Sequence, residues 1–526
     1  MEYSIDLFIG GLIGLATSAG LIFLILKAGW RFGLVDRASE AHHTHTVPVP
    51  RVGGIALAGA LVALVLVFTF LMGTNFLLNS QLWLVVAAAL AMFGLGLWDD
   101  LFTLGAKRKL LGQIVIASFT YFYGLGIFQF QVPFTHQIID LGFGSWLVTV
   151  FWLVAMTNLI NLIDGVDGLA GGICLMLMVL LVYVSAGTGF MPMLAAGMVG
   201  ALLGFLRFNF PPARIYMGDG GAYFLGFLIG GTTIVTSQKG TVFAALVAPL
   251  FVLALPIIDT SLAILRRGLR GLPLFRPDCK HIHHRLLASG HSRRNVVLGL
   301  YAFTAIFLML GFATFFYHGQ WLPLFLGVGT LIFLLMAGKI DFSREWFAVG
   351  RVIGNSIESR ADVRYAMSLS GWLALSGTRV ETMGDLAEDV VFIARKLGFT
   401  TVRIRLKDEE KTWTLNNLAT KNCHTFQHGL PGLKYCFIEL GIACPSSKSK
   451  TTCNPEVCKK CECSYDILAD LVAEGWTKAV VEWKKRTKLS ARFDARMNKP
   501  VVGGEKHLPG METFCVAPND VETPDK

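Results

Sequence analysis

The sequence predicts an all-α polytopic membrane protein with about eleven transmembrane helices, followed by a C-terminal cytoplasmic α+β domain. Hydrophobic residues make up 54% of the chain and charged residues 16%, and the mean hydropathy is +0.57. A soluble chain this apolar could not cover its surface with polar groups. Lysine and arginine gather in alternate loops, which orients the helices. Beyond about residue 340 the composition becomes that of a soluble domain.

A helix that crosses a membrane needs about 20 apolar residues. Segments that meet this requirement lie near 5–27, 53–73, 81–98, 112–129, 143–163, 170–187, 189–206, 221–237, 241–265, 296–316 and 321–338. The first segment lacks a basic start and a small-residue cleavage site, so we expect a retained helix rather than a signal peptide.

The basic residues lie almost entirely in the odd-numbered loops, with Lys239 as the exception. They include Arg31, Arg37 and Arg51 in the first loop, Lys107, Arg108 and Lys109 in the third, Arg207 and Arg214 in the seventh, and eight more between 266 and 294 in the ninth. Because such residues favour the cytoplasmic side, the N-terminus is expected outside and the C-terminus inside. The net charge of +10 can then face anionic lipid heads, and it does not by itself indicate a nucleic-acid partner.

Five aspartates stand at the ends of these apolar segments. Asp99 and Asp100 end the third, Asp164 and Asp167 follow the fifth, and Asp219 precedes the eighth. A carboxylate beside hydrocarbon is costly and seldom kept without a function. The predicted topology puts all five on the cytoplasmic face, which indicates a metal-assisted reaction on a charged substrate. For Asp99 and Asp100 taken alone, a simple helix-end turn is an equally good interpretation.

Two polar motifs flank the predicted segments 170–187 and 189–206, one before them and one after them. Asn158 and Asn161 lie one helical turn apart, just before the turn dipeptides that begin at Asp164 and Asp167. Four polar groups at threefold spacing in so apolar a setting are hard to explain as a turn alone.

The second motif runs from Asn209 to Gly221 and leads directly into a helix. Glycines at a helix start let the backbone approach a phosphate, and Asp219 stands where Mg²⁺ on diphosphate oxygens could be held. Tyr216 could stack on a base or be an ordinary interfacial aromatic.

Three histidines, His281, His283 and His284, lie in the most basic cytoplasmic loop. Together with the neighbouring cations they could bind a diphosphate or position a leaving group. A zinc site is the alternative, but hard acids rather than thiols are the expected neighbours, which favours anion binding.

These four segments, with Gly33–Asp36 and Pro50–Gly54 in the first loop, resemble the polyprenyl-phosphate N-acetylhexosamine-1-phosphate transferases over residues 30 to 295. The resemblance implies a multi-pass enzyme of the cytoplasmic (inner) membrane. With Mg²⁺ or Mn²⁺, such an enzyme transfers a sugar 1-phosphate from a UDP-sugar to polyprenyl phosphate and releases UMP. UDP-GlcNAc is the default donor. A homodimer and a regulatory ligand of the C-terminal domain are candidate partners.

The resemblance also implies a role for each motif residue. Asp99 looks like the base that deprotonates the lipid phosphate, with Asp100 beside it, and Asp219 looks like the metal ligand, with Asn161 as a second candidate. The residues expected to bind substrate are Asn161, Asp164, Asp167, Asn209, Tyr216, Lys109, His281, His283, His284 and Arg51. Lys107 fits the phosphate-anchoring role of Lys109 nearly as well. Whether attack is direct or passes through a covalent Asp219 intermediate is left open by the sequence; we favour direct attack.

Two other functions compete with this one. The His-Ile-His-His form resembles the HexNAc branch, which leaves the phospho-MurNAc-pentapeptide translocase as the runner-up. An ion-coupled transporter would place its acids near mid-span and in inverted repeats, whereas here they stand at span ends. Family members commonly place a serine after the second glycine or alanine of the aspartate motif, where this chain has Gly221 and Ala222. That departure puts one side-chain contact in doubt, not the reaction.

Three domains are predicted: a membrane transferase domain over 1–340, an accessory α+β domain over 341–505, and a tail over 506–526. Apolar spacing predicts a helix over 383–397 capped by Gly398, a strand over 402–406, further strands near 434–440 and 478–485, and a helix near 464–475. The order weakly resembles GAF-type sensory domains. Cysteines that could bind Zn²⁺ or an Fe–S cluster are Cys453, Cys458, Cys461 and Cys463. Reduced, uncoordinated thiols are an equally good interpretation.

Overall fold

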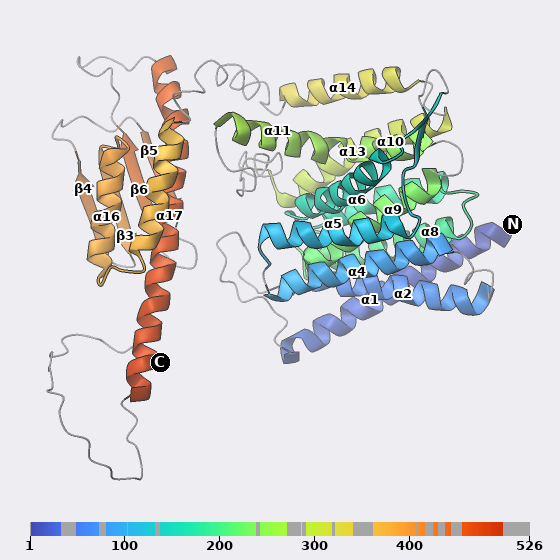
Figure 1. Ribbon diagram of the computed structural model, residues 1–526, viewed down its shortest axis with the longest axis horizontal. Coiled ribbons are helices and arrows are strands. Elements are labelled where there is room, and N and C mark those ends of the chain that lie inside the picture. The colour runs from blue at the N-terminus through green and yellow to red at the C-terminus, as the bar shows by residue number, and fades with distance from the viewer. Residues whose placement is uncertain are drawn as a thin grey trace, which may run out of the picture. The chain divides into compact units, whose positions relative to one another are not determined.

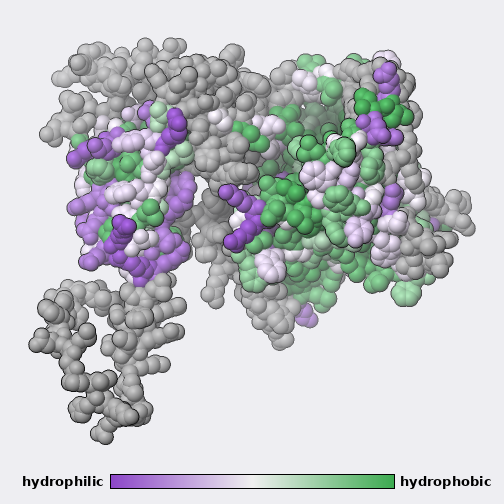
Figure 2. All heavy atoms as spheres, in the orientation of Figure 1, coloured by the Kyte–Doolittle hydropathy of each residue, from purple (hydrophilic) through white to green (hydrophobic). Residues whose placement is uncertain are grey.

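A computed structural model describes residues 2–32, 49–72, 80–102, 104–131, 137–237, 242–270, 286, 291–317, 321–339, 361–406, 409–415, 424–429, 437–442 and 455–497. The chain divides into two compact units, one running from the N-terminus to Tyr365 and one beginning at Ala366. Figure 2 shows a largely apolar surface on the first unit and a largely hydrophilic one on the described part of the second. This difference agrees with the change of composition along the chain.

The described part of the first unit is helical apart from one short hairpin and the connecting turns (Figure 1). Its helices are α1 (Glu2–Phe32), α2 (Gly53–Met72), α4 (Ser80–Phe102), α5 (Ala106–Phe122), α6 (Gly144–Ile163), α7 (Leu169–Val184), α8 (Met191–Asn209), α9 (Gly218–Ser237), α10 (Val242–Val252), α11 (Ala254–Arg270), α13 (Arg293–Phe316) and α14 (Leu322–Lys339). The hairpin pairs β1 (Gln129–Gln131) with β2 (Ile138–Asp140). Seven of the described helices are long and apolar enough to span a membrane, so the protein is a polytopic membrane protein.

Helix α9 lies at the centre of this unit. Its apolar stretch is wholly buried, and α2, α4, α6, α7 and α10 pack around it. Glycines allow the close approach: a Cβ on Gly96 would lie 2.5 Å from the carbonyl oxygen of Asp219, and one on Gly226 would lie 2.6 Å from the Cα of Thr157. The end of α4 is thereby held against the start of α9.

Helices α1 and α8 make an equally close contact. A Cβ on Gly14 would lie 1.9 Å from the carbonyl oxygen of Gly197, and one on Gly200 would lie 1.8 Å from that of Gly11. Small residues one turn apart let two helices pack backbone to backbone in a membrane. This contact attaches α1, whose lipid-facing side is largely exposed, to the buried α8.

Two predicted spans differ from the helices observed. The fourth was expected over 112–129, but α5 ends at Phe122, because Gly124 adopts a left-handed conformation (φ +100°) before β1 begins. The ninth, expected over 241–265, is interrupted at Leu253 between α10 and α11. Pro256 has no N–H to donate to the carbonyl of Val252, which explains the break.

The second unit combines a four-stranded antiparallel sheet of order β4-β3-β6-β5 with helices. The strands are β3 (Thr401–Leu406), β4 (Glu409–Thr414), β5 (His424–Gly429) and β6 (Phe437–Ile442), and the labelled helices are α16 (Met383–Lys396) and α17 (Pro455–Met497). Pairing of Val402 with Leu440 and of Ile404 with Ile438 joins four buried side chains at the centre of the sheet.

The predicted helix over 383–397 and strand over 402–406 agree with α16 and β3, and Gly398 has the left-handed φ of +85° expected of a cap. The predicted strand near 478–485 is wrong, because these residues continue α17. Trp476, Ala479 and Val480 are buried at helical rather than alternating spacing.

Candidate active site

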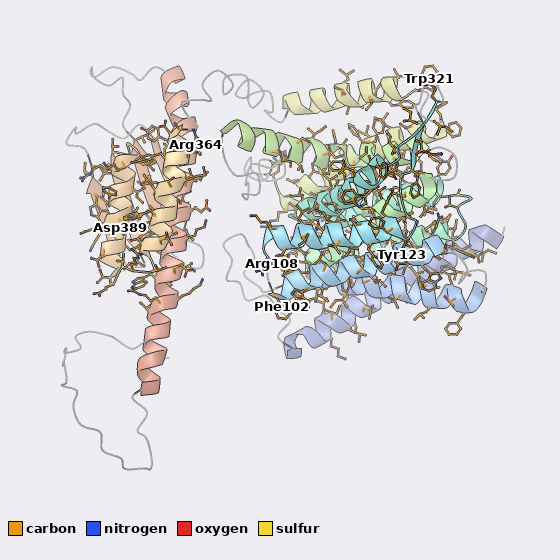
Figure 3. The ribbon with its side chains drawn as sticks, viewed as in Figure 1. Phe102, Arg108, Tyr123, Trp321, Arg364 and Asp389 are labelled. Carbon is orange, nitrogen blue, oxygen red and sulfur yellow. The ribbon has the colours of Figure 1, made fainter. Side chains whose placement is uncertain are left out.

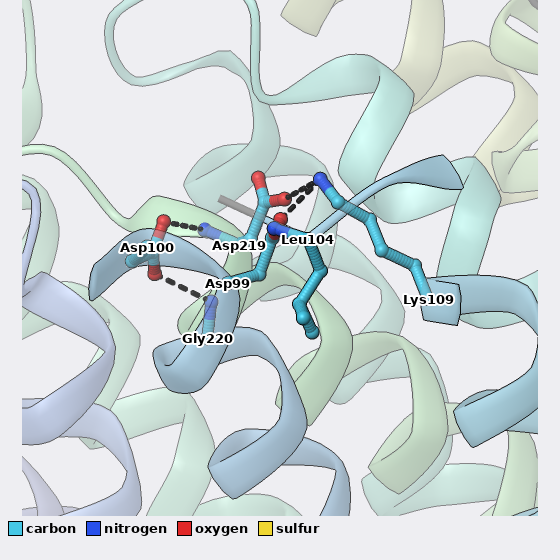
Figure 4. A network of polar contacts seen from close by, with 6 residues as sticks. All are labelled: Asp99, Asp100, Leu104, Lys109, Asp219 and Gly220. Atoms are coloured by element: carbon cyan, nitrogen blue, oxygen red, sulfur yellow. Dashed lines mark hydrogen bonds and ion pairs between the residues drawn. The ribbon is translucent and has the colours of Figure 1, made fainter. Parts of the chain in front are cut away.

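Two carboxylates from distant parts of the chain meet at one lysine (Figure 4). Asp99 stands in the last turn of α4, Asp219 in the first turn of α9, and Lys109 in the first turn of α5. The Lys109 Nζ contacts Asp99 Oδ2 and lies 3.1 Å from Asp219 Oδ2. The backbone N–H of Leu104 donates to the other oxygen of Asp99 at 2.5 Å. The short turn between α4 and α5 therefore aims an ammonium group back at both acids.

The site lies at one end of the helical unit. Figure 3 shows Phe102 and Arg108 together at that end and Tyr123 toward the opposite one. Arg108 and Lys107 are exposed, whereas Lys109 is only partly so. Burial lowers the pKa of Lys109, but the hydrogen bonds and charges of Asp99 and Asp219 outweigh it and raise that pKa above 10.5. Lys109 thus remains a cation at any physiological pH.

Asp100 is bonded to the backbone of α9. Its Oδ1 accepts from the N–H of Asp219 at 3.0 Å and its Oδ2 from the N–H of Gly220 at 2.9 Å. These N–H groups belong to the first turn of α9, which has no partners within the helix and favours negative charge. The catalytic role that the sequence predicts for Asp100 beside Asp99 stays a prediction, and the geometry adds that Asp100 is bonded to the backbone beside Asp219.

The first-loop motif joins the same site through its backbone. The Tyr216 N–H donates to the Pro50 carbonyl at 2.9 Å, and the Gly53 N–H donates to the Tyr216 carbonyl at 2.8 Å. Gly218 is left-handed (φ +75°), and a Cβ there would lie 2.5 Å from the Arg51 carbonyl oxygen. The predicted residues Arg51, Tyr216 and Asp219 are thereby brought together at one place.

The predicted polar groups at the end of α6 and in the α6–α7 turn have different surroundings. Asp164 lies near the acids: burial raises its pKa well above 3.8, the charges of Asp219 and Asp100 raise it further, and Arg51 partly offsets them. Asn158 donates to Gln113 Oε1 at 2.7 Å and to the Val154 carbonyl at 2.8 Å, so it joins α6 to α5.

Two residues predicted to contact substrate bond to the protein itself. Asp167 is buried and accepts from the N–H of Ala213 at 3.2 Å. Asn209 accepts from the N–H of Gly168 at 2.9 Å and donates to the Ile215 carbonyl at 2.8 Å. Both side chains therefore shape the two loops that flank the acids.

Sequence reasoning missed three residues that contact the segment from Asn158 to Gly168. Gln113 follows Lys109 by four residues, so its place on the same helical face could have indicated it. Arg293 was counted only as a loop charge, yet its Nη1 lies 3.9 Å from Asp167 Oδ2. Tyr301 donates from Oη to the Gly168 carbonyl at 2.5 Å, and no spacing pointed to it.

Other predicted residues fall outside the part of the chain that the structure describes. These are His281, His283, His284 and Cys453. Cys458, Cys461 and Cys463 lie on α17, but their side chains are not among those that the structure describes. Within the described ranges, no group of three or more His, Cys, Asp or Glu side chains could hold a metal ion.

Comparison with known proteins identifies the family. The sequence model of glycosyl transferase family 4 matches residues 82–237, the segment that holds all five aspartates. The chain is 33% identical over 345 residues to a probable undecaprenyl-phosphate N-acetylglucosaminyl 1-phosphate transferase of Bacillus subtilis, an alignment that covers 64% of this chain and 93% of that protein.

Two further relatives have similar identity to this chain. A decaprenyl-phosphate N-acetylglucosaminephosphotransferase of Mycolicibacterium smegmatis is 32% identical, with 62% of this chain and 87% of the relative aligned. A phospho-N-acetylmuramoyl-pentapeptide-transferase of Listeria monocytogenes is also 32% identical, with 53% of this chain and 87% of the relative aligned. The chain belongs to glycosyl transferase family 4, within the superfamily of polyprenyl-phosphate N-acetylhexosamine-1-phosphate transferases.

Proposed function

We propose that this protein transfers N-acetylglucosamine 1-phosphate from UDP-GlcNAc to a polyprenyl phosphate such as undecaprenyl phosphate, releasing UMP. This reaction would initiate synthesis of a cell-envelope polysaccharide. The observation that carries the proposal is the meeting of Asp99, Asp219 and Lys109 within the family-matched segment. The relatives whose names describe N-acetylglucosamine phosphotransfer support the choice of sugar.

The type of donor present suits a hard divalent cation, although no three of the described side chains form a complete metal site. The donors gathered around Asp219 are carboxylates, which Mg²⁺ and Mn²⁺ prefer. Two further acids, Asp99 and Asp100, act on Asp219, so these three carboxylates outnumber the cations Lys109 and Arg51. Asp219, with Asn161 as a second candidate, would hold Mg²⁺ or Mn²⁺, which would neutralise the donor diphosphate as the sugar phosphate is transferred.

The protein's own side chains would each have a separate role in the reaction. Asp99 would accept the proton of the acceptor phosphate, which we expect to attack the diphosphate directly. Lys109 would neutralise charge on the reacting phosphates. Its contacts with both acids favour it over the exposed Lys107 as the phosphate anchor. Asp100 would keep Asp219 in position through the two backbone N–H groups it accepts from.

The membrane arrangement that suits this reaction has eleven spans over residues 1–340, the N-terminus outside and the site at the cytoplasmic face of the inner membrane. Distribution of Lys and Arg among the loops supports it. UDP-sugars are made in the cytoplasm, and a lipid acceptor requires a site at the membrane surface. For the second unit we propose a regulatory role with a ligand of its own.

A reconstitution assay tests the reaction. Purified full-length protein is mixed with undecaprenyl phosphate and UDP-GlcNAc, and UMP and lipid-linked sugar are measured. We expect both products only when acceptor, donor and Mg²⁺ or Mn²⁺ are present, and little activity in Asp99→Asn or Asp219→Asn. Full activity in either variant would contradict the roles assigned here.

A second donor belongs in the same assay. The identity to pentapeptide transferases is similar, although the alignment covers a smaller share of this chain. Transfer from UDP-MurNAc-pentapeptide, with none from UDP-GlcNAc, would replace the proposed reaction by that of peptidoglycan synthesis.

A further inference from the structure

Gly168 is the point where three helices of the first unit meet. It precedes α7 in a left-handed conformation (φ +78°). Its N–H donates to Asn209 at the end of α8, at 2.9 Å. Its carbonyl accepts from the Tyr301 hydroxyl of α13, at 2.5 Å. Side chains from two other helices thus hold both backbone polar groups of one residue in the α6–α7 turn.

The same turn is held at a second point by α13. Ser292 caps this helix by accepting from the Asn295 N–H, and Arg293 at its first position lies 3.9 Å from Asp167. Eight residues separate Arg293 from Tyr301, which is about 12 Å along a helix. Two contacts that far apart fix both the distance and the tilt of α13 relative to the turn.

The ring of Tyr301 lies in close contact with α7. A Cβ on Gly172 would lie 2.1 Å from both the Oη and the Cζ of Tyr301. A side chain at that position would therefore displace the ring and its hydroxyl from Gly168. Gly172 and Tyr301 form a matched pair, in which the missing side chain of one admits the ring of the other.

This contact bears on the acids because Asp164 belongs to the same turn, four residues before Gly168, and lies close enough to Asp219 and Asp100 for their charges to act on it. A shift of the turn would move Asp164 relative to the other acids. α13 lies beyond the segment matched by the family model, which ends at residue 237. In sequence it directly follows the loop that holds the three histidines.

We infer that Tyr301 is a positioning residue for the nucleotide-sugar side of the site, acting through its hydrogen bond to Gly168, with Arg293 as the second anchor on Asp167. This inference rests on the proposed function and on the prediction that Asp164 and Asp167, in the α6–α7 turn, bind the nucleotide sugar. It predicts that loss of the Tyr301 hydroxyl weakens the binding of UDP-GlcNAc and leaves the binding of polyprenyl phosphate unchanged.

Calorimetric titration of the full-length protein with UDP-GlcNAc in Mg²⁺ tests it. In Tyr301→Phe we expect the Kd to rise about fivefold, which corresponds to about 1 kcal/mol and is typical of one lost hydrogen bond. Gly172→Ala should act in the same direction. Tyr317→Phe, the same change at the other end of α13, should bind as the wild type does. The KM for undecaprenyl phosphate should stay unchanged in Tyr301→Phe. The thermal midpoint should fall only slightly, because the lost bond also stabilises the folded protein by about 1 kcal/mol.

Gly172→Ala also crowds a helix interface, so Tyr301→Phe is the variant that tests the inference. A wild-type Kd in Tyr301→Phe would overturn the inference and leave the proposed function intact. Equal weakening of donor and acceptor binding would reveal a purely structural role and also overturn it. A wild-type protein that binds no UDP-GlcNAc would overturn the proposed function and this inference together.

Discussion

Replacement of Lys109 by methionine tests the centre of the proposed site. Methionine keeps most of the length of the side chain and removes its charge, so both contacts to Asp99 and Asp219 are lost. Asp99 would keep the N–H of Leu104 as a hydrogen-bond donor. Lys107→Met is the matched control, because Lys107 lies two residues away and is exposed.

The size of the effect follows from the charge that Lys109 would bring to the reacting phosphates. Removing one preorganised group that stabilises charge in the transition state costs about 100- to 1000-fold in kcat. The Lys109 side chain is 28% exposed, so solvent screens its charge in part and the lower value, about 100-fold, applies.

The assay is UMP release by purified protein at saturating donor and acceptor. We expect Lys109→Met to lose about 100-fold in kcat and Lys107→Met less than threefold. The pKa of Lys109 is raised above 10.5, so its contribution is fully present below that pH and is lost only as the pH rises through the raised value. A kcat above a tenth of wild type, or an equal loss in Lys107→Met, would refute the reasoning.

Three further predictions concern single residues. Asp100→Ala removes the acceptor of two N–H groups and should lower kcat about tenfold or more. Asp100→Asn keeps one oxygen acceptor and should lose less activity. Equal activity in the two variants would contradict the positioning role. Gly14→Ala puts a Cβ 1.9 Å from a carbonyl oxygen of α8 and should destabilise the protein by about 1–3 kcal/mol, while Gly20→Ala, with nothing within 4 Å, should leave the thermal midpoint unchanged. The raised pKa of Asp164 means that the folded protein keeps this proton where the unfolded chain has lost it, so stability falls as the pH rises above about 4. In metal-free buffer the thermal midpoint should drop more between pH 5 and 8 in the wild type than in Asp164→Asn, and parallel curves would count against the assignment.

Much of the helical arrangement was predictable because hydrocarbon leaves the backbone few choices. A stretch of about 20 apolar residues must be helical to satisfy its own N–H and C=O groups, so the positions of α2, α4, α6 and α9 follow from local sequence. The predicted bounds or element types were wrong where an apolar pattern in the sequence fits more than one structure. The apolar run after α5 continues past a left-handed glycine, and the alternation near 478–485 belongs to a helix whose buried face was not apparent.

The sequence by itself determined the family motifs, the membrane class and the excess of carboxylates at segment ends, because charge and hydropathy are properties of composition and spacing. Only the tertiary structure decided how those carboxylates differ. Asp99 and Asp219 are separated by about 120 residues in sequence, and they share Lys109 because glycines let α4 approach α9. Asp100 and Asp167 look equally available in the sequence, yet both accept hydrogen bonds from backbone N–H groups of other segments. No spacing rule predicts such long-range bonds, because they depend on which helix ends pack against each other.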